Sequence, residues 1–314
     1  MFRLPSQGSR NFKWLKNCLR CKMSRNQLMP KLLQPNQIKA YTIAYTPQLF
    51  ASVEAPFLPL DHTANERSDW QEYWPIRKFL LNNELDDDCL YGFLSPRFTD
   101  KTGLDGARLM AFLLKEGVGK DIVTISPQPD MGAMFLNVFA QNELFDPGFC
   151  DTADAFFKTI GIDIDVQTCV MDSTQIVFSN YFFAKPAFWR RWLQVNERIF
   201  YLCEEQTEFA TKIGLLKKTS YRDGVNRKVF LMERIASSLL ISESHWQVGN
   251  YNTFLCAYSA SRLNEFPSEC KKADALKIAW NITKNDFYIK EFYKIISQTS
   301  DILSFNINNK GHYK

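Results

Sequence analysis

The stretch VFSNYFFAKPAFWRRW, residues 177–192, sets an aromatic, mostly uncharged run before a lysine, a proline and two arginines. Its first half is rich in aromatic and β-branched residues, so it predicts a strand over residues 176–184. The second half begins at Pro186, and proline suits the first position of a helix because its missing N–H is not needed there. Phe188 and Trp192 recur at i and i+4, as in the core-facing stripe of a helix. The stretch therefore predicts a buried strand that leads directly into a long helix.

Short apolar runs alternate with helical periodicity upstream of this stretch as well. Strands are predicted near residues 40–46, 89–95 and 121–126, with helices between them. Such alternation is typical of an α/β domain with a mostly parallel central sheet flanked by helices. Beyond residue 210 the sequence predicts helices only. We therefore expect an α/β core over residues 38–210 and a helical C-terminal part, residues 211–314, packed on that core.

The positive charge of the chain is concentrated at its N-terminus. Residues 1–53 hold nine Lys or Arg and no Asp or Glu, and because the net charge of all 314 residues is +4, the remainder carries −5. We expect residues 1–37 to be a flexible, solvated basic segment. A second interpretation is peripheral contact with an anionic membrane, and a nucleic-acid arm is the least favoured of the three.

Composition and the scattered cysteines indicate a globular cytoplasmic protein. Apolar residues make up 46% of the chain and aromatic residues 14%, which can fill a sizeable core. The sequence contains neither a signal-peptide apolar region nor an apolar run long enough to cross a bilayer. The eight cysteines fit reduced thiols better than a disulfide framework, and the CxxC pair Cys18 and Cys21 lacks the further ligands of a zinc site. Any membrane contact is then expected to be peripheral, at the inner membrane.

Common catalytic motifs are missing from the sequence. There is no GxSxG, Walker A or GxGxxG motif, and the three histidines fit no nucleophile arrangement. Asp163 and Asp165 have DxD spacing, but they follow a helix that Gly161 is expected to end, so we interpret them as an exposed turn and predict no metal site. The reactions that stay possible without these motifs are catalysed by positioning and electrostatics. Sugar or phosphoryl transfer from an activated donor is the largest class of such reactions.

In open parallel sheets ligands bind at the carboxyl ends of the strands, and this rule selects the candidate residues. Polar side chains follow each predicted strand, and we expect them to lie at one edge of the sheet. They are Tyr45 and Thr46 after the first strand, Ser95 and Arg97 after the second, Asp130 after the third and Lys185 after the last.

Three pieces of the chain, YGFLSPRFTDKTGL, VTISPQPDMGAMFLNVFAQ and VMDSTQIVFSNYFFAKPAFWRRWL, resemble bacterial proteins of surface-polysaccharide biosynthesis that are similar to GT-A type glycosyltransferases. The resemblance covers roughly residues 41–205. It implies a GT-A-like fold, a nucleotide-sugar donor, a saccharide acceptor and a divalent cation, Mn or Mg, on a DxD motif. The sequence departs from the pattern because SPQPD stands where DxD is expected, which puts the metal in question.

Together these expectations give a cytoplasmic glycosyltransferase with a specific set of site residues. The donor nucleotide is placed near Tyr45, Thr46 and Asp61, and its diphosphate near Arg97 and Asp130, with Arg97 or Lys185 stabilising the leaving group. The catalytic base is Asp130 or Asp172, which the sequence does not separate, and Asn180 and Tyr181 contact the acceptor. The alternative is a non-catalytic binding or scaffold protein that keeps the same fold.

Overall fold

The computed structural model describes residues 32–220 and 224–299. The expectations for the basic N-terminus, including Cys18 and Cys21, lie outside the described residues. The described cysteines are all free thiols. Among the described helices, none is both long and apolar enough to cross a membrane.

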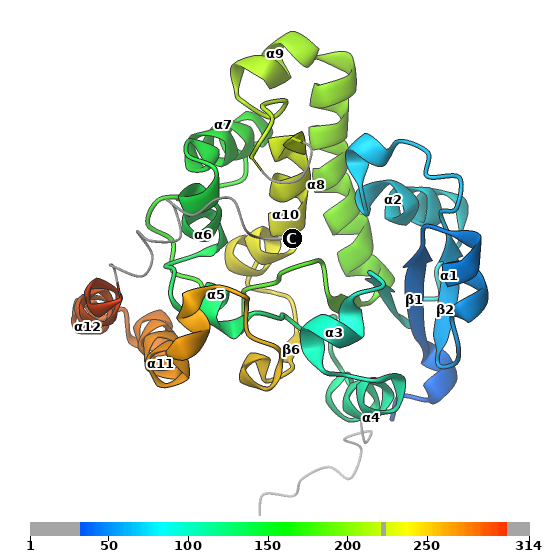
Figure 1. The fold of residues 1–314 in the computed structure, drawn as a ribbon, viewed down its shortest axis with the longest axis horizontal. Coiled ribbons are helices and arrows are strands. Elements are labelled where there is room, and N and C mark those ends of the chain that lie inside the picture. Colours follow the sequence, from blue (N-terminus) through cyan, green and yellow to red (C-terminus); the bar gives the residue numbers. More distant parts are fainter. Residues whose placement is uncertain (1–31, 221–223, 300–314) are drawn as a thin grey trace, which may run out of the picture. The chain divides into compact units, whose positions relative to one another are not determined.

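One six-stranded mixed sheet organises the fold (Figure 1), with strand order β2-β1-β3-β5-β4-β6. Strand β5 is antiparallel to its neighbours β3 and β4, and the other pairings are parallel. The predicted α/β class with a mostly parallel sheet is therefore confirmed. The strands are β1 (Ile38–Ala44), β2 (Phe57–Asp61), β3 (Leu90–Leu94), β4 (Ile122–Thr124), β5 (Phe182–Ala184) and β6 (Val248–Asn250).

Two of these strands are not predicted by the sequence. Strand β2 contains Pro59 and lies at one edge of the sheet, where a missing N–H is tolerated. Strand β6 has three residues, one of them Gly249, and forms the other edge. Because β6 belongs to the C-terminal part, that part completes the sheet and does not only pack on the core.

Helices surround the sheet and dominate the C-terminal part. The predicted periodic segments are confirmed as helices, and the short helices α1 and α3 are additional. The α-helices are α1 (Pro47–Ser52), α2 (Tyr73–Asn82), α3 (Phe98–Thr102), α4 (Gly106–Glu116), α5 (Pro129–Ala133), α6 (Val138–Phe145), α7 (Phe149–Ile160), α8 (Pro186–Glu205), α9 (Thr207–Lys212), α10 (Arg227–Ser242), α11 (Pro267–Thr283) and α12 (Asp286–Gln298).

The sheet separates two apolar cores. Successive residues of β3 point to opposite faces, so Leu90 and Leu94 join the smaller core with α4, whereas Tyr91 and Phe93 join the larger one with α2, α8 and α10. The indole of Trp189 in α8 donates to the carbonyl oxygen of Tyr91 at 2.9 Å, which fixes α8 against the sheet. Helix α8 also packs against α10, so the sheet, α8 and α10 form a continuous scaffold.

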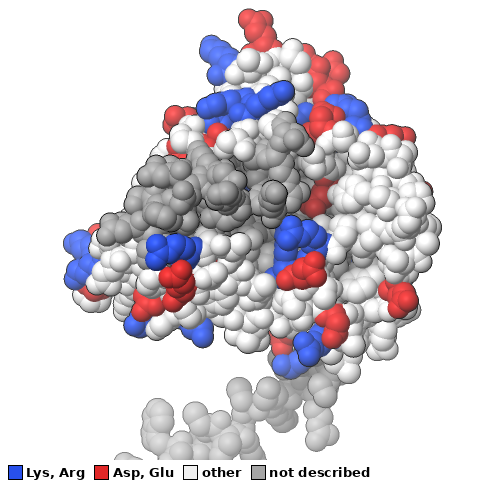
Figure 2. Space-filling view, in the orientation of Figure 1, with Lys and Arg blue, Asp and Glu red and all other residues white. Residues whose placement is uncertain are grey.

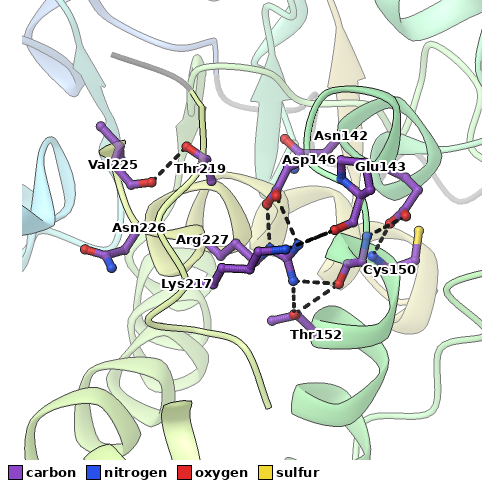
Figure 3. Close-up of polar contacts among 12 residues, drawn as sticks. Asn142, Glu143, Asp146, Cys150, Thr152, Lys217, Thr219, Val225, Asn226 and Arg227 are labelled. Atoms are coloured by element: carbon purple, nitrogen blue, oxygen red, sulfur yellow. Dashed lines mark hydrogen bonds and ion pairs between the residues drawn. The ribbon is translucent and has the colours of Figure 1, made fainter. Parts of the chain in front are cut away.

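A buried arginine joins α10 to the corner between α6 and α7 (Figure 3). All five N–H donors of Arg227 have partners: the two carboxylate oxygens of Asp146, the carbonyls of Pro147 and Gly148, and the hydroxyl of Thr152. Gly148 has a positive φ of 89°, and a Cβ there would lie 3.3 Å from the guanidinium. The corner therefore requires a glycine, and the network fixes the start of α10.

Candidate functional site

The side on which successive strands are added to the sheet changes at β1, between the carboxyl ends of the parallel strands β1 and β3. From β1 it passes to β2 on one side, whereas β3 lies on the other side of β1. In open α/β sheets such a switch point is where ligands bind. Tyr45 follows β1 here, and buried Ser95 and exposed Arg97 follow β3. Strand β5 begins at this same edge because it is antiparallel, which brings residues 178–181 to the switch point.

Residues 178–181 form a tight turn with unusual backbone angles. The N–H of Tyr181 donates to the carbonyl of Phe178 at 3.2 Å, and the two central residues, Ser179 and Asn180, have φ values of 59° and 53°. Such left-handed angles disfavour residues other than glycine, and strained backbone of this kind clusters at functional sites. The surrounding structure holds the turn, since the N–H of Phe178 donates to Ser126 Oγ at 3.1 Å.

Asn180 and Tyr181 in this turn are buried and carry polar groups, and Ser179 is half-buried. Asn180 is 4% exposed, and its Oδ1 accepts no hydrogen bond from the described residues. An unpaired buried acceptor costs about 1–3 kcal/mol, so a ligand donor would be favourable here. The hydroxyl of Tyr181 is hydrogen bonded to that of Ser95. Lys101 from α3 donates to Ser179 Oγ at 2.9 Å, and its Nζ lies 5.5 Å from the Tyr181 ring centroid.

Two carboxylates interact electrostatically with Tyr181, and the sequence did not point to either. Glu72 precedes α2, and Glu233 lies on α10. Burial raises the pKa of Glu72 to about 7, the negative charge of Glu233 adds to the shift and Lys101 opposes it. Burial also raises the pKa of Tyr181, and the charges of Glu72 and Glu233 contribute in the same direction. Neither glutamate belongs to a motif, so only their proximity in the fold identifies them.

Four of the predicted site residues come together at this edge, namely Tyr45, Arg97, Asn180 and Tyr181. The side chain of Arg97 has no hydrogen-bond or ion-pair partner among residues 32–220 and 224–299. Two more predicted residues lie near the same edge, at the ends of β1 and β2, but both have local roles. Thr46 accepts from the N–H of Leu49 and caps α1, and Asp61 accepts from the N–H and hydroxyl of Thr63.

The predicted placement of Lys185 at the ligand edge is wrong. Because β5 runs antiparallel to the other strands, its carboxyl end lies at the opposite edge of the sheet. The N–H of Lys185 donates to the carbonyl of Asp121, which precedes β4. Lys101 takes the place of Lys185 as the second cation at this edge of the sheet, beside Arg97.

The geometry also opposes the predicted catalytic roles of Asp130 and Asp172. Asp130 is 0% exposed, and its carboxylate accepts from the N–H and hydroxyl of Ser259 and from the hydroxyl of Ser261. Asp172 accepts from Thr174 and, at 2.7 Å, from the side-chain amide of Asn281 in α11. Both aspartates therefore anchor loops and helices, and the oxygens of both carboxylates already accept hydrogen bonds from the protein.

The described charged residues include no group of metal ligands, and on the face shown in Figure 2 they are of mixed sign. Asp165 accepts hydrogen bonds from Gln167 and Thr168 in an exposed turn, as its position after Gly161 predicts. Among the described residues no three His, Cys, Asp or Glu side chains are grouped as metal ligands. On the face in Figure 2, described lysines and arginines alternate with acidic residues. The described residues on this face do not form the basic stripe that accompanies nucleic-acid binding.

Comparisons with protein-family models, with curated proteins and with solved structures give no match. The chemistry of the site at the switch point therefore carries the functional proposal.

Proposed function

We propose that the protein transfers a sugar from a nucleotide-sugar donor to a saccharide acceptor, as a cytoplasmic enzyme of bacterial surface-glycan assembly with a GT-A-like fold. The observation that carries this proposal is the convergence of Arg97 and Lys101 with Tyr45, Asn180 and Tyr181 at the switch point of the sheet. Two cations and several hydrogen-bonding groups, beside the half-buried ring of Tyr45 and the buried ring of Tyr181, suit a ligand with both phosphate and sugar parts.

Each part of the site has a role in this reaction. Arg97 and Lys101 bind the diphosphate and stabilise the negative charge that develops on it as the sugar leaves. Tyr45 lies at the end of β1, half-buried against the ring of His62 at 5.6 Å, where it contacts the donor nucleotide. Asn180 and Tyr181 face the acceptor side. The resemblance to GT-A type glycosyltransferases supports the same donor class.

Binding of donor by the full-length chain is the direct test. We expect one class among UDP-, GDP-, CMP- and dTDP-linked sugars to raise the melting temperature of the protein, because a ligand that binds only the native state stabilises it. Each sugar nucleotide is tested both with and without Mn²⁺. Arg97→Ala and Lys101→Ala should each weaken donor binding about tenfold or more, the effect of losing a charge-assisted contact of about 1.5–3 kcal/mol.

Lys185→Ala is the matched control, because Lys185 is a lysine at the opposite edge of the same sheet. It should bind donor like the parent. If no nucleotide sugar stabilises the parent chain, the transferase proposal is overturned and the non-catalytic binding protein is favoured. If Lys185→Ala weakens binding as much as Arg97→Ala, the donor lies elsewhere.

A further inference from the structure

Helix α3 brings the two cations of the site to one side of a single helical turn. The N–H of Lys101 donates to the carbonyl of Arg97 at 3.0 Å, and side chains four residues apart on a helix are neighbours. Arg97 is exposed and Lys101 is half-buried. Because α3 follows directly after β3, both side chains lie at the switch point. An anion that contacts one of these cations can therefore contact the other.

The ammonium group of Lys101 is held in place by Ser179. Its Nζ donates to Ser179 Oγ at 2.9 Å and lies 5.5 Å from the ring centroid of Tyr181. A free lysine side chain is flexible, and ordering it for a ligand costs entropy. An ammonium group has three N–H donors. Among residues 32–220 and 224–299 Ser179 is the only hydrogen-bond partner of this Nζ, so two donors remain for a ligand.

The left-handed backbone of the 178–181 turn determines where Ser179 Oγ lies. Ser179 has a φ of 59° and Asn180 a φ of 53°. Asparagine is enriched at such angles, whereas serine is uncommon there. Glycine would adopt them without steric cost, yet residue 179 is a serine whose hydroxyl contacts Lys101. The backbone strain therefore occurs at a side chain that holds a cation of the site.

Hydrogen bonds on both sides of the turn keep it from relaxing. Before the turn, the N–H of Val177 donates to the hydroxyl of Ser237 in α10 at 2.8 Å. At its end, the carbonyl of Tyr181 accepts from the N–H of Ile125 at 2.8 Å. Strained backbone persists only where the surrounding structure over-determines it. These contacts supply that support, so the position of the Ser179 hydroxyl is set before a ligand binds.

We propose that Ser179 is a positioning residue that orients Lys101 toward the diphosphate of the donor; this inference rests on the proposed function. The hydroxyl oxygen of Ser179 accepts one N–H of Lys101, and the two remaining N–H groups donate to phosphate oxygens. The guanidinium of Arg97 adds a second charge-assisted contact to the same diphosphate. Because Lys101 is ordered in advance, little of its side-chain freedom is lost on binding, and such pre-organisation strengthens binding.

The first experiment measures binding of inorganic pyrophosphate to the full chain, because this probe carries neither sugar nor nucleoside. Calorimetry should show binding by the parent at millimolar pyrophosphate. Ser179→Ala should weaken it about three- to tenfold, the change expected from loss of one hydrogen bond. In a Lys101→Ala background Ser179→Ala should cause no further loss, since effects of coupled residues are not additive. The same loss in both backgrounds, or a parent that does not bind pyrophosphate, would overturn the inference.

The second experiment separates positioning from a purely structural role. Glycine adopts the backbone angles of residue 179 without steric cost, so Ser179→Gly should melt close to the parental temperature and still weaken pyrophosphate binding as much as Ser179→Ala. Asn65→Gly is the matched control. Asn65 is an exposed residue with a φ of 46°, and its N–H donates to the carbonyl of His62. This variant should bind like the parent. Parental binding by Ser179→Gly would show that the hydroxyl does not position Lys101.

The two experiments also distinguish failure of this inference from failure of the proposed function. If a nucleotide sugar stabilises the parent chain but Ser179→Ala and Ser179→Gly bind it like the parent, the positioning role is wrong and the transferase proposal stands. If pyrophosphate binds as expected and no nucleotide sugar does, the transferase proposal is wrong. In that case α3 and the 178–181 turn form a site for another ligand that contains a diphosphate.

Discussion

Replacing Arg227 by methionine should destabilise the protein by about 3–5 kcal/mol, the range for breaking a buried ion pair by removing one partner. Nε and Nη2 of Arg227 donate to the two oxygens of Asp146 at 2.5 and 2.9 Å. Nη1 donates to the carbonyl of Gly148 at 2.8 Å and to Thr152 Oγ1 at 2.9 Å. Methionine fills much of the same volume but donates no hydrogen bond, so Asp146, which is 8% exposed, keeps a buried charge without its partner.

Urea unfolding followed by circular dichroism measures this loss. The midpoint should fall while the slope with denaturant stays unchanged, which indicates lower stability without a change in the surface exposed on unfolding. Adding Asp146→Asn to Arg227→Met removes the unpaired charge and should recover part of the loss, since residues in one network are energetically coupled.

Arg190→Met is the matched control for this experiment. Arg190 pairs with Asp87 at 2.9 Å, but both side chains are mostly exposed, at 61% and 77%. Exposed pairs contribute roughly 0–1 kcal/mol, so Arg190→Met should change stability little. If Arg227→Met costs less than about 1 kcal/mol, or no more than Arg190→Met, burial of the Arg227 network does not stabilise the fold.

Three further predictions concern the core and the loops. Gly92→Ala should destabilise the protein, because a Cβ at Gly92 would lie 2.5 Å from the ring of Phe183, and a thermal melt with and without the compensating Phe183→Leu tests it. His62 is buried and its pKa lies below the usual 6.5, so protonation favours unfolding and stability should fall as pH drops below about 6.5; His62→Gln should flatten this part of a stability–pH curve, and an unchanged curve would contradict it. Asp130→Ala should lower the free energy of unfolding by about 1–3 kcal/mol, because the N–H of Ser259 loses its buried acceptor; a variant as stable as the parent would remove the anchoring role.

Local signals in the sequence predicted much of the secondary structure. Helix α8 begins at Pro186 and α7 ends before Gly161, which has the left-handed φ of 70° that a helix C-cap requires. Such features depend on residues within one or two turns of the position concerned, so the sequence determines them directly. The predicted strand over 176–184 was too long, because the 178–181 turn interrupts it and only Phe182–Ala184 pairs in the sheet.

The site was predicted only in part, for a different physical reason. The rule for strand ends placed Tyr45 and Arg97 at the same edge of the sheet, and the parallel pairing of β1 with β3 has them there. The same rule misplaced Lys185, since the antiparallel direction of β5 depends on pairing with strands distant in the sequence. Asp130 satisfied the rule, yet the loop that carries Ser259 returns to cover it.

The sequence by itself determined the α/β class, the positions of the long helices and the concentration of positive charge at the N-terminus, because these follow from composition and from periodicity over short windows. Only the tertiary structure decided the direction of β5, the burial of Asp130 and the electrostatic interaction of Glu72 with Glu233. These two carboxylates come from segments far apart in the sequence and interact only after the sheet, α2 and α10 have packed. No local sequence pattern encodes that interaction. Burial then raises the pKa of Glu72, which is a property of the folded protein and not of that residue alone.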